Sequence, residues 1–430
     1  MSKNFFGLNR YPWVVSFGLA ASLASPAWMP LRASQAANQT ASLKEYLQLA
    51  LEKNELTRIN QTQQAQYEAK KDQALAPSLP QLKILGSYAK QDVPPGTKRD
   101  DTTSAARVNL AQPILGLYKN YEGLEAARKQ LEAIGLSADD AVLQFKLAVN
   151  EAFHAALIAT GDLASYDEVQ KIAAKRVQEI SGRVKIGRSK PADLYAAEAQ
   201  LASADAQLEQ ARSNLTTALS SLSQVSGVGP EIELSDSLTA PKQTDPLQVY
   251  LSKSSEQPAI KALSAQMAAV GAQVSAVRAQ RVPDLDLIAN YHLRRDPPLK
   301  DVKWDVGVQL TWSIYDGGLI SGKVSEAAAQ RGIYQEQLNQ KQRLTDMKIR
   351  QQHQALEASI RQIPKLERAV TMGQKNYDAI LKDYRLGLAT VLDLIQSSNS
   401  LADARRQLNR QTLTAKSLWV ALKLNAGQTL

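Results

Sequence analysis

The 430-residue chain contains no cysteine. Disulfide bonds, thiolate metal ligands, a cysteine nucleophile and a lipid anchor on an N-terminal cysteine are therefore excluded. Aromatic residues make up only 6% of the chain, and alanine, glutamine, leucine and serine are prominent in it. This composition favours long helices that pack closely through small side chains over a bulky globular core.

Motifs for catalysis are also missing. The histidines His154, His292 and His353 are scattered, and no two of them have the spacing of metal ligands. The sequence has no phosphate-binding loop, no serine elbow and no paired-carboxylate motif. We therefore predict a protein that is not an enzyme, with no catalytic residues, no metal site and no cofactor.

Long hydrophobic runs are absent as well. No segment after the N-terminus has 18 consecutive apolar residues, so the mature chain is predicted to have no transmembrane helix. A part of this chain that crosses a membrane must then do so as a β-barrel, because only helices and closed barrels satisfy their backbone hydrogen bonds in lipid.

Residues 1–36 have the features of a secretory signal peptide. Two basic residues, Lys3 and Arg10, precede a short apolar run at 13–23, and small residues follow through Ala37. Cleavage is expected after Ala36, with Ala27 as a rival site; an uncleaved amphipathic anchor is the alternative. Removal takes three basic and no acidic residues, so the net charge falls from +9 to +6. That modest excess indicates a solvated helix surface and no nucleic-acid partner.

The mature chain consists of two copies of one unit. At an offset of 200 residues Gly187 matches Gly387 and Asp193 matches Asp393, and leucines of the following segments also coincide. A period this long indicates a duplicated half-protein with pseudo-two-fold symmetry and not a solenoid. The chain is thus divided into a signal peptide and two structural repeats, at 1–36, 37–232 and 233–430.

Each copy is predicted to contain a helix, two strands joined by a loop, a very long helix, a turn and a last helix. The turns at Gly187 and Gly387 reverse the chain, which forms hairpin tips near 187–193 and 387–393. The first copy is expected to have helices at 42–77, 117–186 and 191–226 and strands at 81–90 and 105–114. The second is expected to have helices at 247–281, 319–386 and 390–426 and strands at 284–293 and 304–314.

The predicted strands alternate between apolar and polar residues, most clearly at 304–314. This period of two indicates strands with one apolar and one wet side. Each strand is about 10 residues long, the length of a tilted strand that crosses a bilayer. An ordinary antiparallel sheet covered on one side is the alternative. A membrane aromatic belt is favoured by four residues on the apolar side, Tyr88, Tyr291, Trp304 and Trp312.

Four strands cannot close a barrel, since small bacterial barrels need at least eight. The chain must therefore oligomerise if the sheet lies in lipid. Two chains would supply eight strands around an interior filled by side chains, whereas three would leave room for a passage. The last helices carry a heptad seam of leucine and alanine, which predicts a left-handed coiled coil. A plain soluble coiled-coil bundle is the alternative, but it does not explain the strands.

With this combination of repeat, strands and turns, the sequence resembles the TolC family of outer-membrane efflux proteins over about residues 42–427. The most specific elements are the tip pattern from Gly387 to Leu394, its counterpart in the first half and the turn from Ile314 to Gly318. The resemblance implies an α+β membrane protein with a coiled-coil helical barrel and a transmembrane β-barrel shared among three identical subunits. It also implies a passive outer-membrane tunnel, used for efflux or type I secretion, that extends into the periplasm. Its implied partners are outer-membrane lipid, a periplasmic adaptor (membrane fusion) protein and an inner-membrane pump.

The resemblance further implies a gate at the hairpin tips. Asp393 matches the first of two acidic residues that ring the family's periplasmic entrance, and the second is replaced by Gln396. Tyr384 matches a tyrosine that holds the entrance shut, but the position of its arginine partner holds Ala389. Substitutes for that partner are expected among the basic residues Arg385, Arg188 and Lys190.

Two questions stay open at this level. Asp393 can act in a gate or simply cap its helix, and for Asp193 the cap is favoured. A periplasmic coiled-coil adaptor or a scaffold protein is the alternative function; the adaptor would need a lipoyl-like domain and more strands. The candidate residues at the tips are Gly187, Asp193, Tyr384, Gly387, Asp393 and Gln396.

Overall fold

The computed structural model describes residues 40–92, 94, 101–296 and 299–427. The predicted signal peptide and its cleavage sites lie outside the described residues. Those from Thr40 onward belong to one compact unit. Within the described part, no helix combines the length and the apolar character needed to cross a membrane.

The two halves of the chain have the same order of strands and α-helices, and they differ only in where the short 3₁₀ turn falls. The first contains β1 (Thr40–Ala41), α1 (Leu43–Lys53), α2 (Leu56–Leu75), a 3₁₀ turn (Ala76–Ser78), β2 (Gln81–Lys90), β3 (Thr102–Pro113), α3 (Gly116–Lys185) and α4 (Pro191–Ser226). The second contains β4 (Glu233–Leu234), α5 (Leu247–Leu251), a 3₁₀ turn (Ser254–Glu256), α6 (Pro258–Ala279), β5 (Asp284–Arg294), β6 (Trp304–Thr311), α7 (Leu319–Arg385) and α8 (Val391–Asn425).

The first helix of each half is broken, where a single helix was expected. In the first half Asn54 has an extended backbone, and its side-chain oxygen accepts a hydrogen bond of 2.9 Å from the Leu56 N–H. An asparagine that bonds to neighbouring backbone in this way competes with the helix. In the second half Pro258 begins α6, because proline lacks the N–H needed inside a helix and suits its first turn.

Two strand ends also differ from expectation. The strand β6 ends at Thr311 instead of residue 314, so Trp312 lies just beyond it. Thr311 pairs with Asp284, the first residue of β5, and the preceding Pro283 has no N–H for a ladder. At the other end of the sheet β3 begins at Thr102, three residues earlier than expected.

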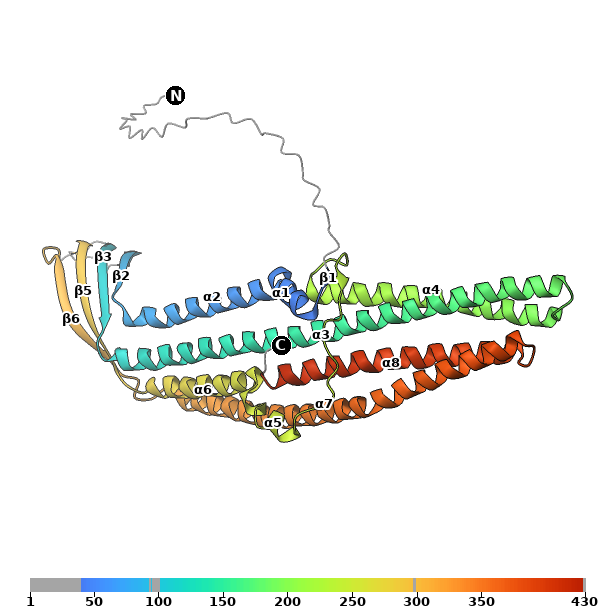
Figure 1. The fold of residues 1–430 in the computed structure, drawn as a ribbon. Helices are drawn as coiled ribbons and strands as arrows, with labels where there is room; N and C mark the ends of the chain where they lie inside the picture. Colours follow the sequence, from blue (N-terminus) through green and yellow to red (C-terminus); the bar gives the residue numbers. More distant parts are fainter. Residues whose placement is uncertain (1–39, 93, 95–100, 297–298, 428–430) are drawn as a thin grey trace, which may run out of the picture. The chain divides into compact units, whose positions relative to one another are not determined.

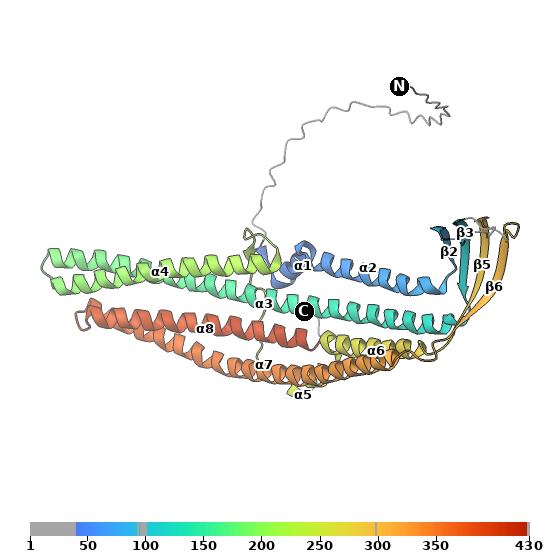
Figure 2. The ribbon, with the colours of Figure 1, turned by 180° about the vertical axis from the view of Figure 1, so that it is seen from behind.

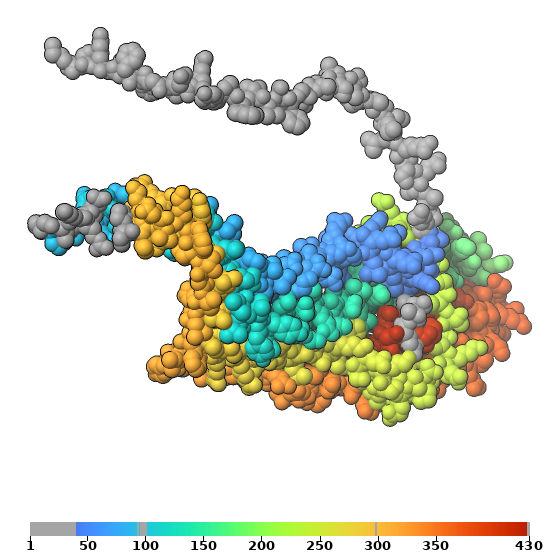
Figure 3. All heavy atoms as spheres, turned by 90° about the vertical axis from the view of Figure 1, so that its left-hand side faces the viewer, coloured from blue at the N-terminus to red at the C-terminus, as the bar shows by residue number. Residues whose placement is uncertain are grey.

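The four long strands form one antiparallel sheet in the order β2-β3-β5-β6. Apolar residues of all four strands share one face. Cross-strand neighbours on this face are Leu82–Leu110, Ile84–Val108, Val108–Tyr291, Leu110–Ala289, Leu287–Val308 and Tyr291–Trp304. The face is open: Ile84 is 77% and Val308 61% exposed. The strands project beyond the helix ends (Figures 1 and 3).

The opposite face of the sheet is polar and internally hydrogen-bonded. The Asn109 amide donates to the Asn290 side-chain oxygen at 2.9 Å, and the Asn290 amide donates to Asp305 at 2.8 Å. His292 Nε2 lies 2.6 Å from the second Asp305 oxygen. One row of polar side chains therefore joins the three strands β3, β5 and β6.

Two long helices, α3 and α7, run from the sheet to the hairpin turns. With 70 and 67 residues, α3 and α7 are about 105 and 100 Å long at 1.5 Å per residue. The helix α4 folds back on α3, α8 folds back on α7, and α3 packs against α8 (Figures 1 and 2). The strands lie at one end of α3 and α7, and the turns lie at the other.

Both halves also have the same core contact midway along the long helices. The Tyr46 ring of α1 packs on Phe153 of α3 with ring centroids 5.6 Å apart. The Tyr250 ring of α5 packs on His353 of α7 at 5.9 Å. Phe153 and His353 are separated by 200 residues. The offset seen in the sequence therefore also relates residues with equivalent places in the two halves of the structure.

The two faces of the sheet predict opposite tolerances to charge. Replacing Val308 by arginine places a charge on the apolar face, which should cost about 2–4 kcal/mol where that face meets the middle of a bilayer. Gln309→Arg places the same charge on the polar face and is expected to be tolerated. The measurement is the amount of heat-modifiable oligomer in outer-membrane fractions, judged on unheated gels. Equal amounts for the two variants would contradict a lipid-facing apolar side.

Candidate gate at the hairpin tips

The two hairpin turns have the same backbone geometry. Gly187 and Gly387 adopt left-handed φ angles of 71° and 79°. One residue later, the N–H of Arg188 donates to the Arg183 carbonyl at 2.8 Å, and the N–H of Leu388 donates to the Asp383 carbonyl at 2.8 Å. This closure of a helix end needs a residue that tolerates positive φ, which explains the glycine at each turn.

The helix after each turn begins with an aspartate in its first turn. An Asp393 carboxylate oxygen accepts hydrogen bonds from the Thr390 N–H at 2.9 Å and from the Thr390 hydroxyl at 2.6 Å. The Thr390 hydroxyl in turn accepts from the Asp393 N–H at 3.2 Å, which completes a capping box. In the first half Asp193 accepts from the Lys190 N–H at 3.2 Å.

Capping keeps the Asp393 carboxylate charged. The side-chain and backbone hydrogen bonds from Thr390 hold the pKa of Asp393 below its ordinary value. Its contribution to helix stability is therefore present above the pKa of the unfolded chain and is lost as the pH falls through the lower folded-state pKa. At neutral pH each subunit presents one negative charge here. Asp393 shares an exposed face of α8 with Leu392 and Gln396.

Behind this exposed face, an apolar cluster joins all four long helices at the tips. Its buried members are Ile180, Ala197, Tyr384, Val391, Leu394 and Ile395. Tyr384 is only 7% exposed, and its hydroxyl is buried with no hydrogen-bond partner among the described residues. The cluster fastens the first hairpin to the second, so separating the hairpins would expose it.

The cation placed against Tyr384 is Arg183, which sequence reasoning missed. The Arg183 guanidinium carbon lies 5.0 Å from the centroid of the Tyr384 ring, within the range of a cation–π interaction. The internal repeat could have pointed to this contact. Tyr384 corresponds to Val184 at the offset of 200, and Arg183 is the residue before Val184, so Arg183 and Tyr384 lie at nearly the same distance from their respective turns.

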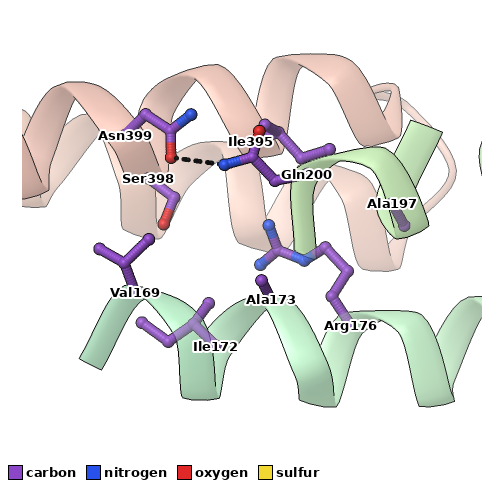
Figure 4. Close-up of a pocket in the computed structure, with 9 residues that line it drawn as sticks. All are labelled: Val169, Ile172, Ala173, Arg176, Ala197, Gln200, Ile395, Ser398 and Asn399. Carbon is purple, nitrogen blue, oxygen red and sulfur yellow. Dashed lines mark hydrogen bonds between the residues drawn. The ribbon is translucent and has the colours of Figure 1, made fainter. Parts of the chain in front are cut away.

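A small cavity lies between α3, α4 and α8 just above the tip cluster (Figure 4). Its volume of about 10 Å³ is room for about one water molecule. The Gln200 amide donates across it to the Asn399 side-chain oxygen at 3.2 Å, which links α4 to α8. Arg176 extends from α3 toward Gln200 and is 8% exposed. Sequence reasoning also missed this buried cation.

The four predicted belt residues lie on the open face of the sheet or just beyond it. Tyr291 and Trp304 are direct cross-strand neighbours beside the 294–303 loop, and Tyr88 lies near the same end. Trp312 lies eight positions after Trp304, or about 26 Å along an extended chain. Tyr88, Tyr291, Trp304 and Trp312 are 75, 51, 67 and 60% exposed. The separation is close to the height of about 25 Å of a barrel's apolar band.

The three histidines have structural partners. His154 is buried in α3 and donates from Nδ1 to the Asn150 carbonyl at 2.9 Å. Burial lowers the pKa of His154, which keeps the ring neutral. His353 donates from Nε2 to the Asp245 carbonyl, and His292 contacts Asp305. Over the described residues, no group of three or more histidine, aspartate or glutamate side chains could hold a metal ion.

Comparisons with known proteins agree with this architecture. The profile of the family "Outer membrane efflux protein" matches residues 46–228 and 252–428. Outer membrane protein TolC of Escherichia coli K12 is 26% identical over 389 residues, which are 85% of this chain and 78% of that protein.

Two solved structures have the same fold. The outer membrane protein VceC of Vibrio cholerae superposes with a TM-score of 0.77 at 21% identity, covering 90% of this chain and 96% of VceC. The CmeC outer membrane channel of Campylobacter jejuni has a TM-score of 0.77 at 15% identity, covering 90% and 85%. The family profile covers both halves of the chain, including the long helices, the sheet and both hairpin tips. The chain therefore belongs to the outer membrane efflux protein family, whose members are channels of the outer membrane that extend into the periplasm.

Proposed function

We propose that three copies of this chain form a passive tunnel that carries substrates from a periplasmic adaptor and an inner-membrane pump to the cell exterior. The pump supplies the energy, and the hairpin tips form the periplasmic entrance. The cargo, which could be a drug, a metal or a polypeptide of type I secretion, is selected upstream by the pump. The tunnel needs no catalytic chemistry of its own.

The single observation that carries the proposal is the open sheet. Its edges, β2 and β6, have no further strand beside them among the described residues, and its apolar face is exposed. An edge strand in lipid has unpaired backbone groups, which cost several kcal/mol each. Strands from other copies remove both edges when the sheet closes. Three copies supply twelve strands around a polar interior, wide enough for a passage.

We propose further that the entrance opens like an iris. In the resting state the tip cluster around Tyr384 and the Arg183 contact hold the two hairpins of a chain together. Opening moves the tips outward and breaks these contacts. Because a ligand shifts a two-state equilibrium only through a difference in affinity, the adaptor must bind the open form more tightly.

A trimer of the purified protein in detergent, with ion-conducting activity in planar bilayers, is the result expected of this function. A water-soluble monomer that remains so without detergent would overturn it. The same fractions, tested for co-purification of an adaptor from the native membrane, show whether the tunnel works within a larger assembly.

In the proposed trimer, three copies of Asp393 form a ring of negative charge at the entrance. Asp393→Asn removes the charge but keeps a side-chain oxygen for the Thr390 N–H. Because a charged constriction concentrates counter-ions, the concentration of a multivalent cation that half-blocks the current should rise about tenfold or more. Single-channel recordings with increasing cation measure this change.

Two variants separate the gate role of Asp393 from its capping role. Gln396→Asp adds a second charge one turn away and should strengthen the block. Thr390→Val removes the cap, at a cost of about 1 kcal/mol in helix stability, but should leave the block intact. If Thr390→Val weakens the cation block while the two variants that change the charge leave it unaltered, the Asp393 ring is not a cation site.

The Arg183–Tyr384 contact predicts a difference between a tyrosine variant and an arginine variant. Tyr384→Phe keeps the ring, and the lost hydroxyl has no hydrogen-bond partner in the described chain, so the closed state should persist. Arg183→Ala removes a contact worth about 0.5–2 kcal/mol per subunit and should raise the open probability. Both are measured in planar bilayers, with Arg188→Ala as the control in the exposed turn. An open channel in Tyr384→Phe would show that the hydroxyl, and not the cation, closes the entrance.

A further inference from the structure

The order of the four long helices leaves two of them on the flanks. The helix α3 packs against α4 and α8, and α7 packs against α8 and α6. The helices therefore follow one another as α4, α3, α8 and α7 (Figures 1 and 2). The flanking helices expose charged residues of opposite sign. Asp205 and Glu209 are exposed on α4, and Arg361 and Arg368 are exposed on α7.

The central seam between α3 and α8 is held by charged pairs. Arg405 of α8 lies 3.2 Å from the Glu168 carboxylate of α3. Farther along the seam, Arg410 lies 2.8 Å from the Asp162 carboxylate. A β-carbon added at Gly161 would meet the Asn409 side chain, so this side chain of α8 packs directly on the α3 backbone there.

The internal repeat tells which residues occupy the same places in the other half. Buried positions midway along α3 and α7 correspond at an offset of 200. The pairs are Val149 and Ile349, Phe153 and His353, and Ala156 and Leu356. The turns at Gly187 and Gly387 have the same offset, so it holds across the segment between. Under this correspondence α3 becomes α7 and α8 becomes α4. The equivalent of the α3–α8 seam is therefore a seam between α7 and α4.

The residues at the equivalent positions are complementary. The ion pair Glu168–Arg405 becomes Arg368 with Asp205, which is an ion pair with its signs exchanged. The other two pairs also have matching partners. The pair Asp162–Arg410 corresponds to Gln362 with Gln210, two amides that can hydrogen-bond. The pair Gly161–Asn409 corresponds to Arg361 with Glu209, which can form a second ion pair.

We propose that α7 of one copy docks on α4 of the next copy through Arg368–Asp205 and Arg361–Glu209. The partner is a second copy of this chain, because within one chain α7 and α4 lie on opposite flanks of the α3–α8 pair. The contact joins two different surfaces, and contacts of this kind form a ring when the rotation between copies closes, as in the proposed trimer. The inference rests on the proposed trimer and names the seam that builds it.

Three of the four charged residues have no partner on another helix of the single chain. The Arg368 side chain has no hydrogen-bond or ion-pair partner in the described part of the chain. Asp205 accepts one hydrogen bond, at Oδ1 from the Gln170 amide of α3 at 3.0 Å, so its other carboxylate oxygen remains available to a neighbouring copy. Arg361 and Glu209 pair only along their own helices, with Glu357 at 3.6 Å and Arg212 at 2.5 Å, and both remain mostly exposed. Exposed local pairs of this kind contribute little to stability, so they exchange readily for a contact between copies.

Small side chains on both flanks allow the helices to approach. In the central seam Ala402 packs on Val169 and Ala173. The equivalent residues are Ala202 on α4, which is exposed, and Ala369 and Gly373 on α7. Alanine and glycine at these positions leave room for close backbone packing between copies.

Cysteine cross-linking tests the seam, because the natural chain has no cysteine to interfere. The variant Arg361→Cys with Glu209→Cys pairs the positions equivalent to the close approach of Gly161 and Asn409. Oxidation should link neighbouring copies and give covalent dimers and trimers on heated, non-reducing gels. The matched control, Gly161→Cys with Asn409→Cys, lies within one chain and should give a shifted monomer without a ladder.

Charge reversal tests the ion pair itself. Asp205→Arg alone should lower the temperature at which the oligomer dissociates, because it faces Arg368. Adding Arg368→Asp should restore that temperature, whereas adding Lys375→Asp, at another exposed basic position of α7, should not. Cross-links together with specific rescue support the seam. A stable trimer with neither result overturns the seam and leaves the proposed function standing. A protein that forms no oligomer in mild detergent contradicts the proposed function.

Discussion

Backbone hydrogen bonding at the edges of a four-stranded sheet is the constraint on which the rest of the protein depends. The sheet β2-β3-β5-β6 has an apolar face with side chains such as Ile84 and Val308 open to the surroundings. In water such a face favours aggregation, and in lipid the unpaired edges are costly. Both problems are solved together when sheets from several copies close in a bilayer. In the proposed trimer, oligomerisation is therefore a condition of the subunit's stability.

Because the long helices continue from the strands, closure of the sheet also affects how the helices are arranged. The sheet passes directly into α3 and α7, and Lys119 at the start of α3 holds Asp284 at the start of β5 with a contact of 2.5 Å. A ring of strands therefore implies a ring of helices beneath it. In the proposed trimer the duplication would make contacts between chains similar to the α3–α8 contact within a chain.

The tips are where this equivalence ends. Both turns have the same glycine geometry and the same aspartate at the helix start, but only the second hairpin has a buried tyrosine with a cation against its ring. The tips thus add a contact between the hairpins that the repeat by itself does not supply. In the proposed iris, this contact holds the hairpins together in the resting state.

Much of the fold could be predicted from the sequence. Alternation of apolar and polar residues located β2 to the residue, and the repeat located the turns at Gly187 and Gly387. These features are local, because side-chain period and glycine conformation depend on neighbouring residues. The breaks at Asn54 and Pro258 had local causes too, but a helical pattern on both sides hid them. Of the candidate site, Asp393 and its position at a helix start could be predicted, since capping is also local.

By itself the sequence determined the period of each element, the duplication and the residues available at each turn. Only the tertiary structure decided which helices lie side by side and therefore which charges meet. Arg183 against Tyr384, Arg405 against Glu168 and the burial of Arg176 all join segments far apart in the chain. Such contacts depend on the rotation and height at which two helices pack, and no periodicity within either helix encodes that relation.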